Sequence, residues 1–81
     1  SISSERGSPL LWRLLATVYG RQNDLGMAAY ALSEEAMARG DKSGAKNHAK
    51  RAISLLPEGS SGWLKASDVL ANADSKGENK P

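Results

Sequence analysis

The sequence contains no cysteine and no phenylalanine, and it has a single histidine. Without cysteine the chain forms no disulfide and offers no thiolate to a metal or a substrate. The metal-binding motif His-Glu-x-x-His needs two imidazoles on one helical face, so His48 alone excludes it. There is no apolar run of about 18 residues, which excludes a predicted membrane span. Residues 1–6 lack the apolar core of a secretory signal, and because no Met opens the chain we expect it to be part of a longer protein.

Strong charge of one sign is also missing. The chain has 11 basic and 9 acidic residues, and this net charge of +2 is too small to favour a nucleic-acid partner. Neighbouring carboxylates at Glu34 and Glu35 would point about 100° apart on a helix, so they cannot share a proton or a metal. We expect both to be solvated or to flank an interface. The row Lys42, Lys46 and Lys50, and His48 among them, are also expected on a solvated face.

No constellation of catalytic residues can be found. The serines gather near helix starts and in the tails, and no Ser–His–Asp set is suggested. No glycine-rich loop is placed to hold a phosphate. We therefore predict no catalytic, cofactor-binding or metal-binding residue in this chain, and no enzymatic activity of its own.

What the sequence does contain is alanine-rich amphipathic segments separated by turn signals. Apolar residues recur at helical spacing in four segments, which we predict as helices over 9–22, 25–39, 42–56 and 60–72. The start and stop signals are Ser8-Pro9, Asn23-Asp24, Gly40-Asp41 and Pro57-Glu58-Gly59-Ser60. The predicted organisation is a flexible segment 1–7, a helical domain 8–73 and a polar disordered tail 74–81.

The expected core follows from the apolar stripes of these segments. Eight residues are predicted to be mostly buried: Trp12, Leu15, Leu32, Ala45, Ala49, Ala52, Ile53 and Leu70.

An internal repeat organises the helices. If Gly26 takes position 1 of a 34-residue unit, Gly40-Asp41 falls at positions 15–16, Ala45 at 20, Ala52 at 27 and Pro57 at 32. This is the pattern of the tetratricopeptide repeat (TPR), two antiparallel helices whose small residues permit close packing. The next unit would begin at Ser60 and place Trp63 at position 4. The predicted fold is all-α: an antiparallel helix-turn-helix TPR-like array of four helices.

A second frame matches almost as well. With Pro9 at position 1, Trp12 falls at 4, Ala16 at 8 and Tyr19 at 11, but Glu35 at position 27 fits poorly. The two frames differ by half a repeat. The sequence therefore leaves open which helices form the inner, groove-lining layer.

The two frames predict different binding surfaces. In the Gly26 frame the second and fourth helices line the groove, with an apolar centre and acidic edges suited to a segment with apolar anchors and basic residues. Its predicted partner-binding residues are Met27, Tyr30, Glu34, Met37, Leu64 and Asp68. In the Pro9 frame the groove would be basic and would present Arg13, Thr17 and Arg21 to an acidic partner. The alternative for Tyr30 and Met37 is that they pack on a neighbouring helix.

The stretch from Pro9 to Leu70 resembles the C-terminal TPR region of bacterial periplasmic Zn-dependent metalloproteases that serve as outer-membrane-assembly chaperone-proteases. The resemblance rests on Leu11–Ala16, Tyr19–Arg21, Ala29–Ala36, Arg39–Asp41 with Ala45, Leu56–Ser60 and Trp63–Asp68. It implies a parent zinc metallopeptidase, a periplasmic location, and a zinc ion in an N-terminal protease domain that this sequence does not include. It also implies that the repeat region docks client proteins or the protease domain.

Two other functions stay open from the sequence. The chain could be a TPR adaptor of an unrelated complex, or a structural helical spacer with no ligand. For a docking module or an adaptor the expected partners are protein or peptide segments. Neither nucleic-acid binding nor membrane insertion is expected for any of these functions.

Overall fold

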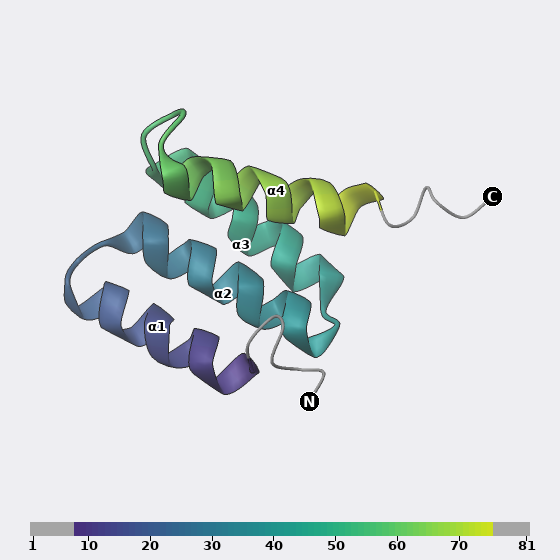
Figure 1. The fold of residues 1–81 in the computed structure, drawn as a ribbon, viewed down its shortest axis with the longest axis horizontal. Helices are drawn as coiled ribbons and strands as arrows, with labels where there is room; N and C mark the ends of the chain where they lie inside the picture. Colours follow the sequence, from purple (N-terminus) through teal and green to yellow (C-terminus); the bar gives the residue numbers. More distant parts are fainter. Residues whose placement is uncertain (1–7, 76–81) are drawn as a thin grey trace.

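The computed structural model describes residues 8–75, which form four helices: α1 (Pro9–Arg21), α2 (Leu25–Arg39), α3 (Lys42–Leu55) and α4 (Ser61–Ser75). Successive helices run in opposite directions, and the described part of the chain contains no strand (Figure 1). The all-helical class and the four predicted segments are thereby confirmed. Helix α4 ends at Ser75 rather than near residue 72, so the predicted tail does not begin at Asp74. The segments 1–7 and 76–81, predicted to be flexible, lie outside the described residues.

The residues that begin and end the helices act as the sequence predicts. Each of four side chains accepts a hydrogen bond from a backbone N–H in the first turn of its helix, and these caps are Ser8, Asp24, Asp41 and Ser60. Gly40 closes α2 with a φ of 83°, a left-handed conformation that glycine adopts without a steric penalty. These local signals explain why the predicted helix bounds differ little from those observed.

Helix α2 is the central element of the array. It packs against α1, α3 and α4, and α3 also packs against α4 (Figure 1). Within residues 8–75, α1 approaches neither α3 nor α4. The resulting body is thin, with extents of 42 × 31 × 18 Å. Each helix therefore keeps at least one side open to solvent.

The core is made mainly of alanine. Ala45, Ala49 and Ala52 of α3 are completely buried, as the sequence predicts, and Ala31 and Ala66 are equally inaccessible. Small side chains let the helix backbones approach closely, so the contacts between helices are short and dense.

The five larger residues of the predicted core are partly rather than completely buried: Trp12, Leu15, Leu32, Ile53 and Leu70. Trp12, Ile53 and Leu70 pack against the buried core, and in a thin array no further layer of residues 8–75 covers them. Most of the remaining buried hydrophobics are on α2 and α4, namely Ala29, Tyr30, Ala36, Val69 and Ala73.

Two glycines permit a close crossing of three helices. A Cβ atom on Gly26 of α2 would lie 2.7 Å from Cγ of Leu56, and one on Gly62 of α4 would lie 2.5 Å from Sδ of Met27 and 3.2 Å from Cδ1 of Leu56. Leu56 thus fills the space where α2, α4 and the end of α3 converge. Neither glycine is required by a turn, so only packing explains them.

Candidate functional site

A hollow of about 250 Å³ opens between α2 and α4. Helix α2 contributes Tyr30, Glu34 and Met37, which lie one and two turns apart on one face. Helix α4 contributes its own stripe: Lys65, Asp68, Val69 and Asn72. The direct packing of α2 on α4 brings the two stripes together, and the result is an apolar floor with charged edges.

Tyr30 forms the floor of this α2/α4 hollow. Its ring is buried and meets the ring of Trp12 edge-on, with centroids 5.8 Å apart and an interplanar angle of 83°. Its hydroxyl donates a hydrogen bond of 2.7 Å to Oε2 of Glu34. Burial raises the pKa of Tyr30 far above its usual value, and the hydrogen bond to Glu34 and the negative charge of Asp68 add to this effect. The phenol is therefore a neutral donor that holds the Glu34 carboxylate at the rim.

The hollow gathers four of the six predicted partner-binding residues, namely Tyr30, Glu34, Met37 and Asp68. Met27 and Leu64 are not among its lining residues. The sulfur of Met27 lies beside Gly62, and Leu64 is 55% exposed. The alternative that Tyr30 packs on a neighbouring helix describes its ring, which meets Trp12 of α1, and the residue is only 7% exposed.

Sequence reasoning missed three lining residues of α4. Lys65 precedes Asp68 by three residues and Asn72 follows it by four, so both lie on the same helical face. This spacing is visible in the sequence. Val69 is a core residue whose edge reaches the hollow, and only the packing of α4 on α2 reveals that.

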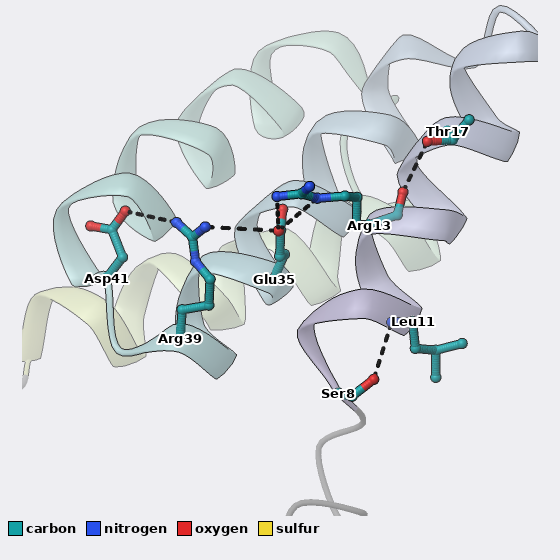
Figure 2. A network of polar contacts seen from close by, with 7 residues as sticks. All are labelled: Ser8, Leu11, Arg13, Thr17, Glu35, Arg39 and Asp41. Carbon is teal, nitrogen blue, oxygen red and sulfur yellow. Dashed lines mark hydrogen bonds and ion pairs between the residues drawn. The ribbon is translucent and has the colours of Figure 1, made fainter.

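A network of polar contacts connects α1 with α2 and with the turn that follows α2 (Figure 2). Both Nε and Nη2 of Arg13 lie 3.1 Å from Oε2 of Glu35. Arg39 lies between Glu35, at 3.9 Å, and Asp41, at 3.7 Å. Of the two alternatives for Glu35, a solvated side chain is wrong, because this side chain is only 10% exposed; it flanks the contact of α1 with α2. Its carboxylate is compensated by two arginines, which offsets the cost of burying the charge.

The same network bears on the basic surface that the Pro9 frame predicts on α1. The guanidinium of Arg13 is engaged by Glu35, and the hydroxyl of Thr17 donates a hydrogen bond to the carbonyl oxygen of Arg13. Arg21, in the last turn of α1, makes no ion pair with any of residues 8–75. Two of the three predicted residues therefore already have partners.

A second hollow, of about 540 Å³, lies between α2 and α3. Its floor is a stripe of α2, and its wall is made of polar side chains of α3. The floor residues are Leu25, Ala28, Ala29 and Leu32, and the wall residues are Asn47, His48 and Arg51. His48, expected to be a solvated residue, is a half-buried part of this wall.

Over residues 8–75, no group of three or more His, Asp or Glu side chains is placed to hold a metal ion. None of the helices in that range is long and apolar enough to cross a membrane. Comparison of the chain with protein-family models, with curated proteins and with solved structures finds no match in any of the three.

Proposed function

We propose that this chain is a non-catalytic protein-interaction module that binds partner segments in the α2/α4 hollow. The observation that carries the proposal is the hollow itself, whose lining residues within 8–75 combine Tyr30 and Met37 with the carboxylates of Glu34 and Asp68, against the single cation Lys65. Methionine and tyrosine are enriched in protein interfaces because they make large, adaptable contacts. The two carboxylates favour a segment that carries a lysine or arginine beside its apolar anchors.

The arrangement of the helices supports a TPR-like assignment in the Gly26 frame. In such an array the inner helices of successive units pack on each other, and the outer helices stand further apart. Here α2 packs on α4, whereas α1 and α3 do not meet. This pattern favours α2 and α4 as the inner layer, which is the layer that lines the groove. The small hollow suits a short segment bound at about micromolar affinity.

The parent protein is a further part of the proposal. The resemblance of Pro9–Leu70 to the repeat tail of periplasmic Zn-dependent metalloproteases suggests that the module docks clients or the protease domain of such an enzyme. The architecture of residues 8–75 agrees with a docking role, since it presents helix faces and two hollows to solvent.

Selection from a random peptide library, followed by amide chemical-shift mapping, tests the proposed site. Peptides enriched on the 81-residue chain should combine apolar residues with lysine or arginine. Their shifts should cluster on Tyr30, Glu34, Met37 and Asp68. The Asp68→Lys variant should bind these peptides about tenfold more weakly, because an attractive charge becomes repulsive.

Glu58→Lys is the matched control. Glu58 is exposed in the loop before α4 and does not line the hollow, so its reversal changes the net charge equally. Equal loss of binding in both variants would show that only overall charge matters. Shifts clustered on Arg13, Thr17 and Arg21 would instead select the alternative frame. Absence of shifts with every enriched peptide and with the isolated protease domain would favour a structural spacer.

A further inference from the structure

The four helices divide the charges of this protein between two layers. Helices α1 and α3 contain no acidic residue, and they carry six of the basic ones: Arg13, Arg21, Lys42, Lys46, Lys50 and Arg51. Helices α2 and α4 carry Glu34, Glu35, Asp68 and Asp74 against only Arg39 and Lys65. The outer helices are therefore basic, whereas the inner ones are acidic. The small net charge of +2 does not reveal this separation of charges between helices.

The larger hollow, between α2 and α3, lies on the basic side. Leu25, Ala28 and Leu32 follow one another at helical spacing along α2 and form an aliphatic floor about two turns long. Leu25 is 51% exposed, although no turn or cap requires an apolar residue there. Ala28 and Leu32 are partly exposed, so within residues 8–75 part of this floor stays open to solvent.

The two hollows use nearly opposite faces of α2. At about 100° per residue, the floor stripe centred on Ala28 and Leu32 is roughly 170° away from the stripe of Tyr30, Glu34 and Met37. A segment bound in one hollow would therefore not cover the other. The surfaces also differ in charge, since the α2/α4 hollow carries two carboxylates against one ammonium, whereas the α2/α3 hollow carries a guanidinium and an imidazole and no carboxylate among the described residues that line it.

The cation beside the larger hollow is available to a partner. Arg51 is exposed and makes no ion pair with any of residues 8–75. This contrasts with Arg13 and Arg39, which are paired with Glu35, and with Lys46, which lies 3.0 Å from Asp74. An unpaired guanidinium next to an apolar floor suits a carboxylate attached to an apolar segment, because the fork of donors can bind both carboxylate oxygens.

We propose that the α2/α3 hollow is a second docking surface, which binds an acidic protein segment through two or three apolar side chains and a carboxylate held by Arg51. An aliphatic floor favours a protein segment over RNA or single-stranded DNA, whose bases need aromatic platforms. Neither tryptophan nor tyrosine lines this hollow. With the α2/α4 hollow on the opposite face, the module would hold a basic segment and an acidic segment at once.

Selection of random peptides on the 81-residue chain also tests this second surface. We expect a class of enriched peptides that contain aspartate or glutamate next to leucine, isoleucine, valine or methionine. These peptides should bind about tenfold more weakly to Leu25→Ser and to Arg51→Glu. The two residues are exposed, so both variants should keep the helical circular dichroism of the parent chain.

Two matched controls lie on α4. Leu64→Ser removes a leucine of similar exposure, 55% against 51%, and Lys65→Glu reverses a charge beside the other hollow. Both should leave the affinity for the acidic peptides within about twofold of the parent chain, because neither residue lines the α2/α3 hollow.

Three results would overturn the proposal. The first is that no acidic peptide is enriched above the level found with Leu25→Ser. The second is that Leu64→Ser or Lys65→Glu weakens binding as much as the paired variant. The third is that vesicles rich in phosphatidylserine, or an RNA oligonucleotide, bind to the chain, and that this binding is lost in Arg51→Glu but kept in Leu25→Ser. Such a result would show that the surface recognises anionic charge alone.

Discussion

Replacing Gly26 by alanine tests the close crossing of α2 with the end of α3. In an open helix, Gly→Ala stabilises by about 0.4–1 kcal/mol, because alanine loses less backbone entropy on folding. At Gly26 the new Cβ would lie 2.7 Å from Cγ and Cδ2 of Leu56 and 3.3 Å from Cβ of Leu55. Overpacking of this kind costs about 1–3 kcal/mol. The clash should therefore cancel or exceed the gain.

Gly20→Ala is the control that isolates the clash. Gly20 lies near the end of α1, and an added Cβ there would meet no atom within 4 Å. It should raise the melting temperature, since each kcal/mol moves the midpoint of a domain this size by about 4–8 °C. The difference in unfolding free energy between the two variants cancels the intrinsic helix preference of alanine over glycine, and what remains measures the clash. We expect Gly26→Ala to be less stable than Gly20→Ala by about 1–3 kcal/mol.

The assay is urea unfolding followed by circular dichroism, with thermal melts as a second readout. A Leu56→Ala background should remove most of the Gly26→Ala penalty, because the atoms that clash are gone. If Gly26→Ala and Gly20→Ala stabilise the chain equally, the close contact between Gly26 and Leu56 is refuted. If the penalty persists unchanged without the Leu56 side chain, then Leu56 is not its cause.

Three further predictions concern the core, the polar network and pH. Ala52→Leu should lower the free energy of unfolding by about 1–3 kcal/mol, because Ala52 is completely buried. Its control, Ala71→Leu on the exposed face of α4, should change the urea midpoint little. Equal midpoints for the two variants would argue against the helix contact at Ala52. Arg13→Ala should lower the free energy of unfolding by about 1–2 kcal/mol, between the values for exposed and buried ion pairs, because it leaves the carboxylate of Glu35 with Arg39 alone. Arg21→Ala on the same helix should cost less than about 0.5 kcal/mol. An equal loss of stability in both variants would mean that the contact of Arg13 with Glu35 contributes nothing. The raised pKa of Tyr30 means that the unfolded chain releases this proton first, so the free energy of unfolding should fall as the pH rises above about 10; a Tyr30→Phe variant that declines just as steeply in urea titrations would contradict this.

Local signals in the sequence carried most of the secondary structure. The caps Ser8, Asp24 and Asp41 and the left-handed Gly40 are recognisable without any tertiary contact, because they act within one turn of the helix they begin or end. The buried alanines of α3 were also predictable. Their spacing of three and four residues places them on one face, where small side chains indicate close packing.

The candidate site was only partly predictable. The repeat frame starting at Gly26 nominated Tyr30, Glu34, Met37 and Asp68, which the structure places around one hollow. It also nominated Met27 and Leu64, which lie elsewhere. A register assigns a residue to a helix face, but the tilt and separation of neighbouring helices decide which residues of that face share a hollow.

Charge pairing was outside the reach of the sequence. Arg13 and Glu35 are 22 residues apart, and no periodicity links them, so the sequence could not show whether Glu35 is solvated or flanks an interface. Only the packing of α1 on α2 brings the guanidinium to the carboxylate. The assignment of basic residues to α1 and α3 and of acidic residues to α2 and α4 follows from the helix bounds, but only the fold shows that α2 packs on α4 while α1 and α3 stay apart.

By itself, then, the sequence determined to within a residue where each helix begins and where α1, α2 and α3 end, and which alanines lie between helices, since these depend on neighbours within a few residues. The tertiary structure decided that α2 packs on α4 while α1 and α3 stay apart, and that Gly26 and Gly62 make room for Leu56. It also decided which polar residues are buried or exposed. These outcomes depend on contacts between distant segments, whose geometry is set by the summed packing of all four helices.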